Sequence, residues 1–150
     1  LYEGVKVGFG SDGSGHGGLD LFKEMRLFRG VMNIGRGINS ADSEVMSAEN
    51  ILKMATTGGS SCLFMDKVGS VEVSNKADLI LLDINSVGLF PTQNLVHSLV
   101  ESASGSDVDT VIVNGKILME NKNFTTLDKD KIFYEARRLF EKHSWLNCWK

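Results

Sequence analysis

The chain has 150 residues, of which 42% are hydrophobic and 23% charged, and its formal net charge is −3 at pH 7. This length and composition suit one globular domain and exclude a disordered chain. The weakly acidic charge offers no basic surface for nucleic acid, and no apolar run approaches the roughly 20 residues that cross a bilayer, so we expect neither nucleic acid nor a membrane as partner.

The first 65 residues are expected to form a strand, a glycine-rich loop and two helices. The apolar run at residues 5–9 predicts a short strand that leads into the stretch GFGSDGSGHGG. Apolar residues at helical spacing predict an amphipathic helix over about residues 19–32, and the composition of the following NIGRGINSADSE indicates a loop. Ser47 is a suitable N-cap for a second helix, AENILKMAT, which Gly58 and Gly59 would end or break.

The sequence after Asp66 predicts a small β unit that is closed by a helix. The stretches GSVEV and ADLILLD predict strands, the second buried on both faces because its middle is apolar throughout. Two apolar runs flank Asn114 and Gly115 in VDTVIVNGKILME, which predicts a tight hairpin because both turn residues tolerate positive φ. Asp128 precedes KDKIFYEARRLFEKH, whose apolar spacing predicts a C-terminal amphipathic helix.

The glycine-rich stretch fits the GxGxxG pattern of dinucleotide-binding loops at Gly8, Gly10 and Gly13, but three features argue against that function. About five further loop residues separate Gly13 from the predicted helix, whose N-terminus should begin there to face a pyrophosphate. Asp12 would place a negative charge beside the phosphates, and no second strand ending in an acid follows about 20 residues later. A Walker loop is excluded because the stretch has no Gly-Lys-Ser or Gly-Lys-Thr.

Asp12 instead lies where the end of a predicted strand releases an acid into a glycine-rich turn. In parallel α/β barrels, catalytic residues lie at the C-terminal ends of the strands. A carboxylate at such a place can bind a cation and accept a proton from metal-bound water. The spacing alone favours the simpler interpretation, in which Asp12 and Gly13 form an Asx turn.

His16 is a candidate for a second metal ligand, but the sequence does not supply a complete zinc site. Zinc takes about four ligands, usually three of them from the protein in catalytic sites. His97 and His143 lie far along the chain, and no HxH pair occurs. His16 is therefore interpreted as a polar loop residue or a support for a ligand, and His97 as structural. Ser11 and Ser14 have no neighbouring general base, which gives a serine nucleophile little support.

Four blocks of the sequence, VGFGSDGSGHGGLDLFKEMR, ILKMATTGG, VGSVEVSNKADLILLD and SGSDVDTVIVNGKILMEN, follow one another in a specific order. Together they resemble the C-terminal part of the metal-dependent amidohydrolases, in the branch that contains triazine chlorohydrolases and deaminases of adenosine-type compounds and guanine. The resemblance implies an α/β fold, namely a C-terminal fragment of a (β/α)8 barrel. The last strand, the active-site loop and the following helices would occupy residues 1–65. Part of a small composite β-sandwich would occupy residues 66–127, and a C-terminal helix and tail residues 128–150.

The resemblance also implies roles for the residues of the glycine-rich stretch. It aligns GSDG at residues 10–13 with the family's Gly-Thr-Asp-Gly, so Asp12 would be a metal ligand and the catalytic proton acceptor. Ser11, Ser14 and His16 would contact substrate or support the ligand. HGG stands before Leu19 where the family often has Ser-Asn-Asn, which leaves the substrate open. The family's His-x-His, its two later histidines and its catalytic Glu are expected upstream of the first residue.

We therefore expect the parent enzyme to be a metal-dependent amidohydrolase that hydrolyses a C–N bond, a deaminase of a purine- or triazine-like small heterocyclic substrate. One divalent metal, Zn or Fe, is expected in the parent, whereas this chain alone is expected to bind none and to be inactive. The chain is expected to self-associate as a dimer or higher oligomer, because open strand edges and apolar faces favour pairing.

Alternatives stay open at this point. Within enzymes, the alternatives are a chlorohydrolase or a cyclic-amide hydrolase with the same metal site. Outside enzymes, the alternative is a non-catalytic, stand-alone β module for oligomerisation, and the reading frame upstream of the first residue would distinguish it. Cys62 and Cys148 lie in unrelated contexts without a CxxC motif, which favours a reducing cytoplasmic location.

Overall fold

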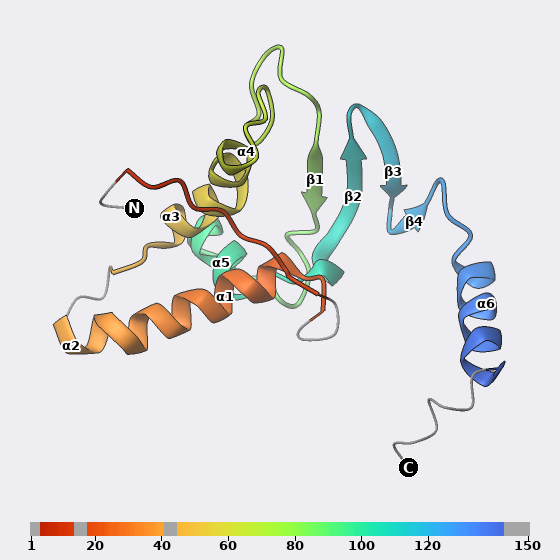
Figure 1. Cartoon of the computed structure of the whole chain (residues 1–150), viewed down its shortest axis with the longest axis horizontal. Coiled ribbons are helices and arrows are strands. Elements are labelled where there is room, and N and C mark those ends of the chain that lie inside the picture. The colour runs from red at the N-terminus through yellow and green to blue at the C-terminus, as the bar shows by residue number, and fades with distance from the viewer. Residues whose placement is uncertain (1–3, 14–17, 41–44, 143–150) are drawn as a thin grey trace.

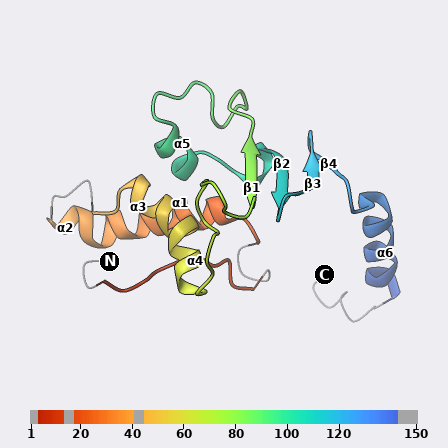
Figure 2. The same ribbon diagram turned by 90° about the horizontal axis from the view of Figure 1, so that it is seen from above.

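A computed structural model describes residues 4–13, 18–40 and 45–142 of the chain. Within these residues the strand order of the single sheet is β1-β2-β3-β4. Helices α1 to α5 lie on the side of β1, and α6 stands beyond β4 at the opposite end (Figure 1). The view from above shows the same separation between the helical group and α6 (Figure 2). None of the described helices has the length and hydropathy of a membrane span.

The first helix, α1 (Leu21–Met32), begins where the sequence predicts it. The carboxylate of Asp20 caps it by accepting a hydrogen bond from the backbone N–H of Phe22 at 3.0 Å. The chain then continues as a π-helical turn, η1 (Asn33–Gly37), and a short α2 (Ile38–Ser40).

The predicted loop is therefore wrong for residues 33–40, and its last four residues lie outside the described part of the chain. Glycine costs a helix only about 1 kcal/mol, and adding residues to an established helix is far easier than starting one. The side-chain amide of Asn39 also donates to the carbonyl of Gly35 at 3.2 Å, which supports this end of the helix.

The second helical segment comprises α3 (Ala48–Lys53), the π-helical turn η2 (Met54–Gly58) and α4 (Gly59–Cys62). The predicted cap is confirmed, since the Ser47 hydroxyl accepts from the backbone N–H of Asn50 at 3.2 Å. The predicted end at Gly58 and Gly59 is wrong, because both adopt right-handed helical φ angles and the helix runs to Cys62. The helix changes to π-helical hydrogen bonding over Met54–Gly58 and returns to α-helical hydrogen bonding at Gly59.

The sheet is antiparallel throughout, and its strands are β1 (Leu79–Leu82), β2 (Val108–Val113), β3 (Lys116–Glu120) and β4 (Asn123–Phe124). The predicted hairpin is confirmed, as Asn114 and Gly115 have φ of 49° and 77° between β2 and β3. A second turn of the same kind, which sequence reasoning missed, has Asn121 and Lys122 at φ of 49° and 62° and adds β4.

Three predictions about strands are wrong. Residues 5–9 form no strand, because no other described strand lies beside them to share backbone hydrogen bonds. Residues 69–73 also form none, and the side chain of Val73 is 98% exposed. The strand β1 is present but is not buried on both faces. Its neighbours Ile80 and Leu81, which point to opposite faces, are each about half exposed because the described residues cover neither face fully.

One helix of the core, α5 (Leu95–Glu101), was not predicted. The side chain of Asn94 caps it by accepting from the backbone N–H of His97 at 3.0 Å. Val100 on this helix and Ile51 on α3 are both fully buried. They share one core with residues of α1, α3 and η2; its buried members are Met25, Met46, Ala48, Ile51, Met54 and Val100.

The predicted C-terminal helix is confirmed as α6 (Lys129–Lys142). The carboxylate of Asp128 accepts from the backbone N–H of Lys131 at 2.9 Å, as expected of a cap. The apolar side chains of α6 are exposed, with Phe133 and Phe140 each more than half accessible. The apolar face that the sequence predicts is therefore present but is not covered by any described residue.

Candidate active site

Asp12 lies three residues beyond Phe9, which packs against the helical core. Its backbone has φ of 51°, in the left-handed region that Asp adopts more readily than most residues. The carboxylate is exposed and hydrogen-bonds to none of the described residues. An Asx turn would use the N–H of residue 14, which lies outside the described residues, so that interpretation stays open. Among the described residues, the Asp12 carboxylate is thus exposed to solvent and has no hydrogen-bond partner.

The other predicted site residues are only partly covered by the structure. Ser11, which precedes Asp12 in the sequence, is partly buried. Ser14 and His16 lie outside the described residues. Within the described ranges, no group of three or more His, Cys, Asp or Glu side chains could enclose a metal ion. A carboxylate oxygen is an accepted zinc ligand. Asp12 therefore fits one ligand position, and the described residues do not complete the set.

The segment before Asp12 is anchored at Phe9. The ring of Phe9 meets the ring of Phe28 on α1 edge-to-face, with centroids 5.3 Å apart and planes at 84°. This geometry is favourable for aromatic pairs. The contact fixes the chain three residues before Asp12 against the helix that follows the glycine-rich loop.

The far end of the loop is held by Asp20. One carboxylate oxygen of Asp20 caps α1, and the other accepts from the backbone N–H of Gly105 at 3.2 Å. The guanidinium of Arg26, one turn further along, donates to the carbonyl of Ala103 at 2.8 Å. The start of α1 is thereby tied to the residues that lead into β2, so both ends of the loop that carries Asp12 are fixed.

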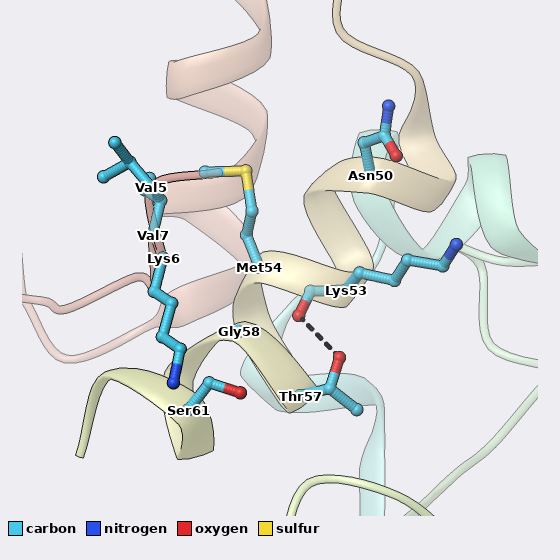
Figure 3. A pocket seen from close by; sticks show the side chains of 9 residues that line it. All are labelled: Val5, Lys6, Val7, Asn50, Lys53, Met54, Thr57, Gly58 and Ser61. Carbon is cyan, nitrogen blue, oxygen red and sulfur yellow. Dashed lines mark hydrogen bonds between the residues drawn. The ribbon is translucent and has the colours of Figure 1, made fainter. Parts of the chain in front are cut away.

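A pocket of about 250 Å³ flanks the N-terminal segment but does not include Asp12. Figure 3 shows it between residues 5–7 and the α3–η2–α4 segment, whose facing residues include Asn50, Lys53, Met54, Thr57, Gly58 and Ser61. The hydroxyl of Thr57 donates a hydrogen bond to the backbone carbonyl of Lys53 at 3.4 Å. The pocket and the predicted catalytic residue are thus separate features.

Arg29 links α1 to α5 through a set of polar contacts. Its guanidinium forms an ion pair with Glu101, lies 3.3 Å from Nε2 of His97 and donates to the carbonyl of Met46 at 3.2 Å. The Arg29 side chain is only 13% exposed, so these partners satisfy a largely buried charge. This network supports the structural role that the sequence predicts for His97.

Asp107 is a buried carboxylate that sequence reasoning missed, although Ser104 three residues earlier forms a capping pattern with it. It is 6% exposed and accepts from the backbone N–H and the hydroxyl of Ser104 at 2.8 and 2.9 Å. The hydroxyl of Ser86, and then the groups of Ser104, hold the pKa of Asp107 below its usual value of 3.8, although burial acts in the opposite direction. The backbone carbonyl of Asp107 accepts from the N–H of Asp83, which fixes the end of β1 beside the start of β2.

The lowered pKa predicts a pH-dependent contribution of Asp107 to stability. The folded-state pKa lies below that of the unfolded chain, so the contribution is complete above the unfolded value and is lost as pH falls through the folded value. We expect Asp107→Asn to lower the free energy of unfolding by about 1–2 kcal/mol at neutral pH, and the difference from wild type to shrink below pH 3.8. Urea unfolding of both chains at one protein concentration, from neutral pH to about pH 2, measures it.

The control for this experiment is Asp66→Asn, which makes the same chemical change at an exposed site. It should change the free energy of unfolding by less than about 0.5 kcal/mol at any pH. A constant difference between wild type and Asp107→Asn across the pH range would contradict the assigned charge stabilisation.

Comparison with known proteins identifies the family. The sequence model of the amidohydrolase family matches residues 1–118, and the chain therefore belongs to this family. It is 46% identical over 143 residues to a 5-methylthioadenosine/S-adenosylhomocysteine deaminase of Dictyoglomus thermophilum. This alignment covers 94% of this chain and 33% of that protein. It is 38% identical over 141 residues to a 5'-deoxyadenosine deaminase of Methanobrevibacter smithii, covering 92% and 32%. The chain thus spans about a third of the length of the curated relatives that it matches.

Solved structures give the same result. An adenosine deaminase of Xanthomonas campestris with bound zinc superposes with a TM-score of 0.81 at 27% identity, over 92% of this chain and 31% of that one. An atrazine chlorohydrolase of Arthrobacter aurescens in complex with zinc gives a TM-score of 0.77 at 26% identity, over 93% and 30%. The resemblance to the deaminase and chlorohydrolase branch is confirmed, as is the α/β fold class.

Proposed function

We propose that this chain is the Asp12-bearing part of a metal-dependent amidohydrolase that deaminates an adenine nucleoside or a related purine compound. The observation that carries the proposal is the identity with deaminases of such nucleosides across nearly the whole chain. The free carboxylate of Asp12, held on an anchored segment, supports it from the structure. A chlorohydrolase of triazines is the second candidate, because a structure of that activity superposes almost as well.

The proposed architecture follows the family. Residues 1–65 would supply the last barrel strand, the active-site loop and the next helices, residues 66–127 part of a composite β-sandwich, and residues 128–150 the C-terminal helix and tail. The superposition of 92% of this chain on 31% of a solved adenosine deaminase supports the proposal that the chain is part of such a fold. Self-association and a cytoplasmic location stay predictions.

In the proposed reaction, Asp12 would be one ligand of a Zn²⁺ or Fe²⁺ ion, which would supply a nucleophile at neutral pH by lowering the pKa of a bound water. The carboxylate of Asp12 would also accept the proton of that water. Ser11, Ser14 and His16 are proposed to contact the substrate or support Asp12, and the remaining ligands would come from other parts of the parent enzyme.

The test is substrate profiling of the full-length enzyme that contains this chain. We expect ammonia release from 5'-deoxyadenosine, 5-methylthioadenosine or S-adenosylhomocysteine, with the adenine spectrum replaced by that of hypoxanthine. Atrazine serves as the comparison substrate, with chloride release as its readout. Faster chloride release than ammonia release would favour the chlorohydrolase, and no hydrolysis of any of these compounds by the zinc-loaded enzyme would overturn the proposal.

A further inference from the structure

Gly8 and Gly58 bring the N-terminal segment into direct backbone contact with the α3–η2–α4 helix. A Cβ atom at Gly58 would lie 2.5 Å from the carbonyl oxygen of Val7. A Cβ atom at Gly8 would lie 2.8 Å from the Cα and 3.2 Å from the nitrogen of Gly59. Real Cβ contacts are almost never this short, so both sides of the contact require glycine.

This contact is where the segment and the helix meet backbone to backbone. Within the described residues, no hydrogen bond joins residues 4–13 to another part of the chain. Side chains hold the segment as well: Val7 and Phe9 pack against the helical core, and the Lys6 ammonium lies 5.6 Å from the centroid of the Phe64 ring. Asp12 follows Gly8 by only four residues, so a displacement at Gly8 is transmitted along a short piece of chain to the carboxylate.

We propose that Gly8 and Gly58 are positioning residues that set the location of the Asp12 carboxylate. This inference rests on the proposed function, in which Asp12 is a metal ligand and proton acceptor. A methyl group at Gly58 needs about 1 Å of additional space to reach an ordinary contact with the carbonyl of Val7, so the segment and the helix must move apart at this point. A misplacement of about 1 Å at a catalytic group can cost on the order of 10²-fold in rate.

Gly69 provides the matched control. Its φ is 89°, and a Cβ atom there would lie 2.8 Å from the hydroxyl of Ser60 and 3.0 Å from the carbonyl of Thr56. Gly69→Ala therefore strains the same helix, but from a segment other than the one that leads to Asp12. Gly30→Ala is the control without a clash, because Gly30 lies within α1 and its Cβ would meet no described atom outside its own helix within 4 Å; it should keep kcat and not lower the melting temperature.

The experiment compares Gly58→Ala, Gly8→Ala, Gly69→Ala and Gly30→Ala in the full-length enzyme. The measurements are the melting temperature, kcat, KM and the visible spectrum of the enzyme with cobalt(II) in place of zinc. We expect Gly58→Ala and Gly8→Ala to lower kcat by about 10- to 100-fold, to change KM less than about threefold and to alter the cobalt spectrum. Gly69→Ala should lower the melting temperature yet keep kcat within about twofold and leave the spectrum unchanged.

The outcomes separate this inference from the proposed function. Equal losses of kcat in Gly58→Ala and Gly69→Ala at matched melting temperatures would overturn positioning and leave the deaminase intact. If the wild-type enzyme hydrolyses none of the test compounds, the proposed function fails, and the cobalt spectrum still decides whether the glycines place the Asp12 ligand. If Gly58→Ala does not fold, Gly8→Ala carries the test from the other side of the same contact.

Discussion

Asp12→Asn in the full-length enzyme is expected to keep the fold and to lower kcat by about 10²-fold or more. Asn is nearly the same size as Asp but is neutral, so it neither balances the charge of the ion nor accepts the proton of the attacking water. The fold should persist because the Asp12 carboxylate is exposed and hydrogen-bonds to no described residue. Steady-state kinetics with an adenine nucleoside, together with a thermal melt of each protein, measures both parts.

The matched control is Asp130→Asn, which removes a carboxylate from the exposed first turn of α6. It should leave kcat within about twofold, since α6 stands at the opposite end of the sheet from the helical group (Figure 1). If Asp12→Asn retains kcat within a few-fold of wild type, Asp12 is a turn residue and the proposed chemistry is wrong.

The elements that the sequence predicted well are those with local causes. The hairpin follows from Asn114 and Gly115, whose backbone tolerance is a property of two adjacent residues. Helix α6 and its cap at Asp128 follow from spacing within about four turns. Ser47 likewise satisfies an N–H only three residues away. Such signals depend on little outside the segment itself, so they survive in any tertiary context.

The errors arise where partners distant in the sequence decide the outcome. Residues 5–9 have the composition of a strand, but a strand also needs a neighbouring strand, which the described residues do not supply. Gly58 and Gly59 look like a helix end by composition, yet they continue the helix because residues 7 and 8 pack against them. The glycine pair was visible in the sequence, but its partner 50 residues earlier was not.

For the candidate site and its surroundings too, the sequence indicated some residues and missed others. Asp12 was predicted because the residues around it resemble the family's Gly-Thr-Asp-Gly; the family itself is confirmed, and the role of Asp12 stays a prediction. The buried carboxylate of Asp107 was missed, although Ser104 and Asp107 have the spacing of a capping pair. Helix α5 was missed as well, although Asn94 precedes apolar residues at helical spacing. A systematic search for capping residues would have found both.

Ile51→Ala is expected to lower the free energy of unfolding by about 3 kcal/mol, the largest loss of stability predicted for a single change in this chain. Ile51 is fully buried in the core where α3 meets α1 and α5, beside Met25 and Val100. Alanine removes the apolar contacts of the larger side chain and leaves a cavity that three helices cannot easily close. Urea unfolding of the 150-residue chain at one fixed protein concentration measures the change.

Ile38→Ala is the matched control, because it deletes the same atoms from a side chain that is 73% exposed on α2. It should change the free energy of unfolding by less than about 0.5 kcal/mol. If the two variants lose equal stability, Ile51 is not packed as described. The helical core would then not be the body that supports the segment leading to Asp12, and the proposed positioning by Gly8 and Gly58 would lose its support.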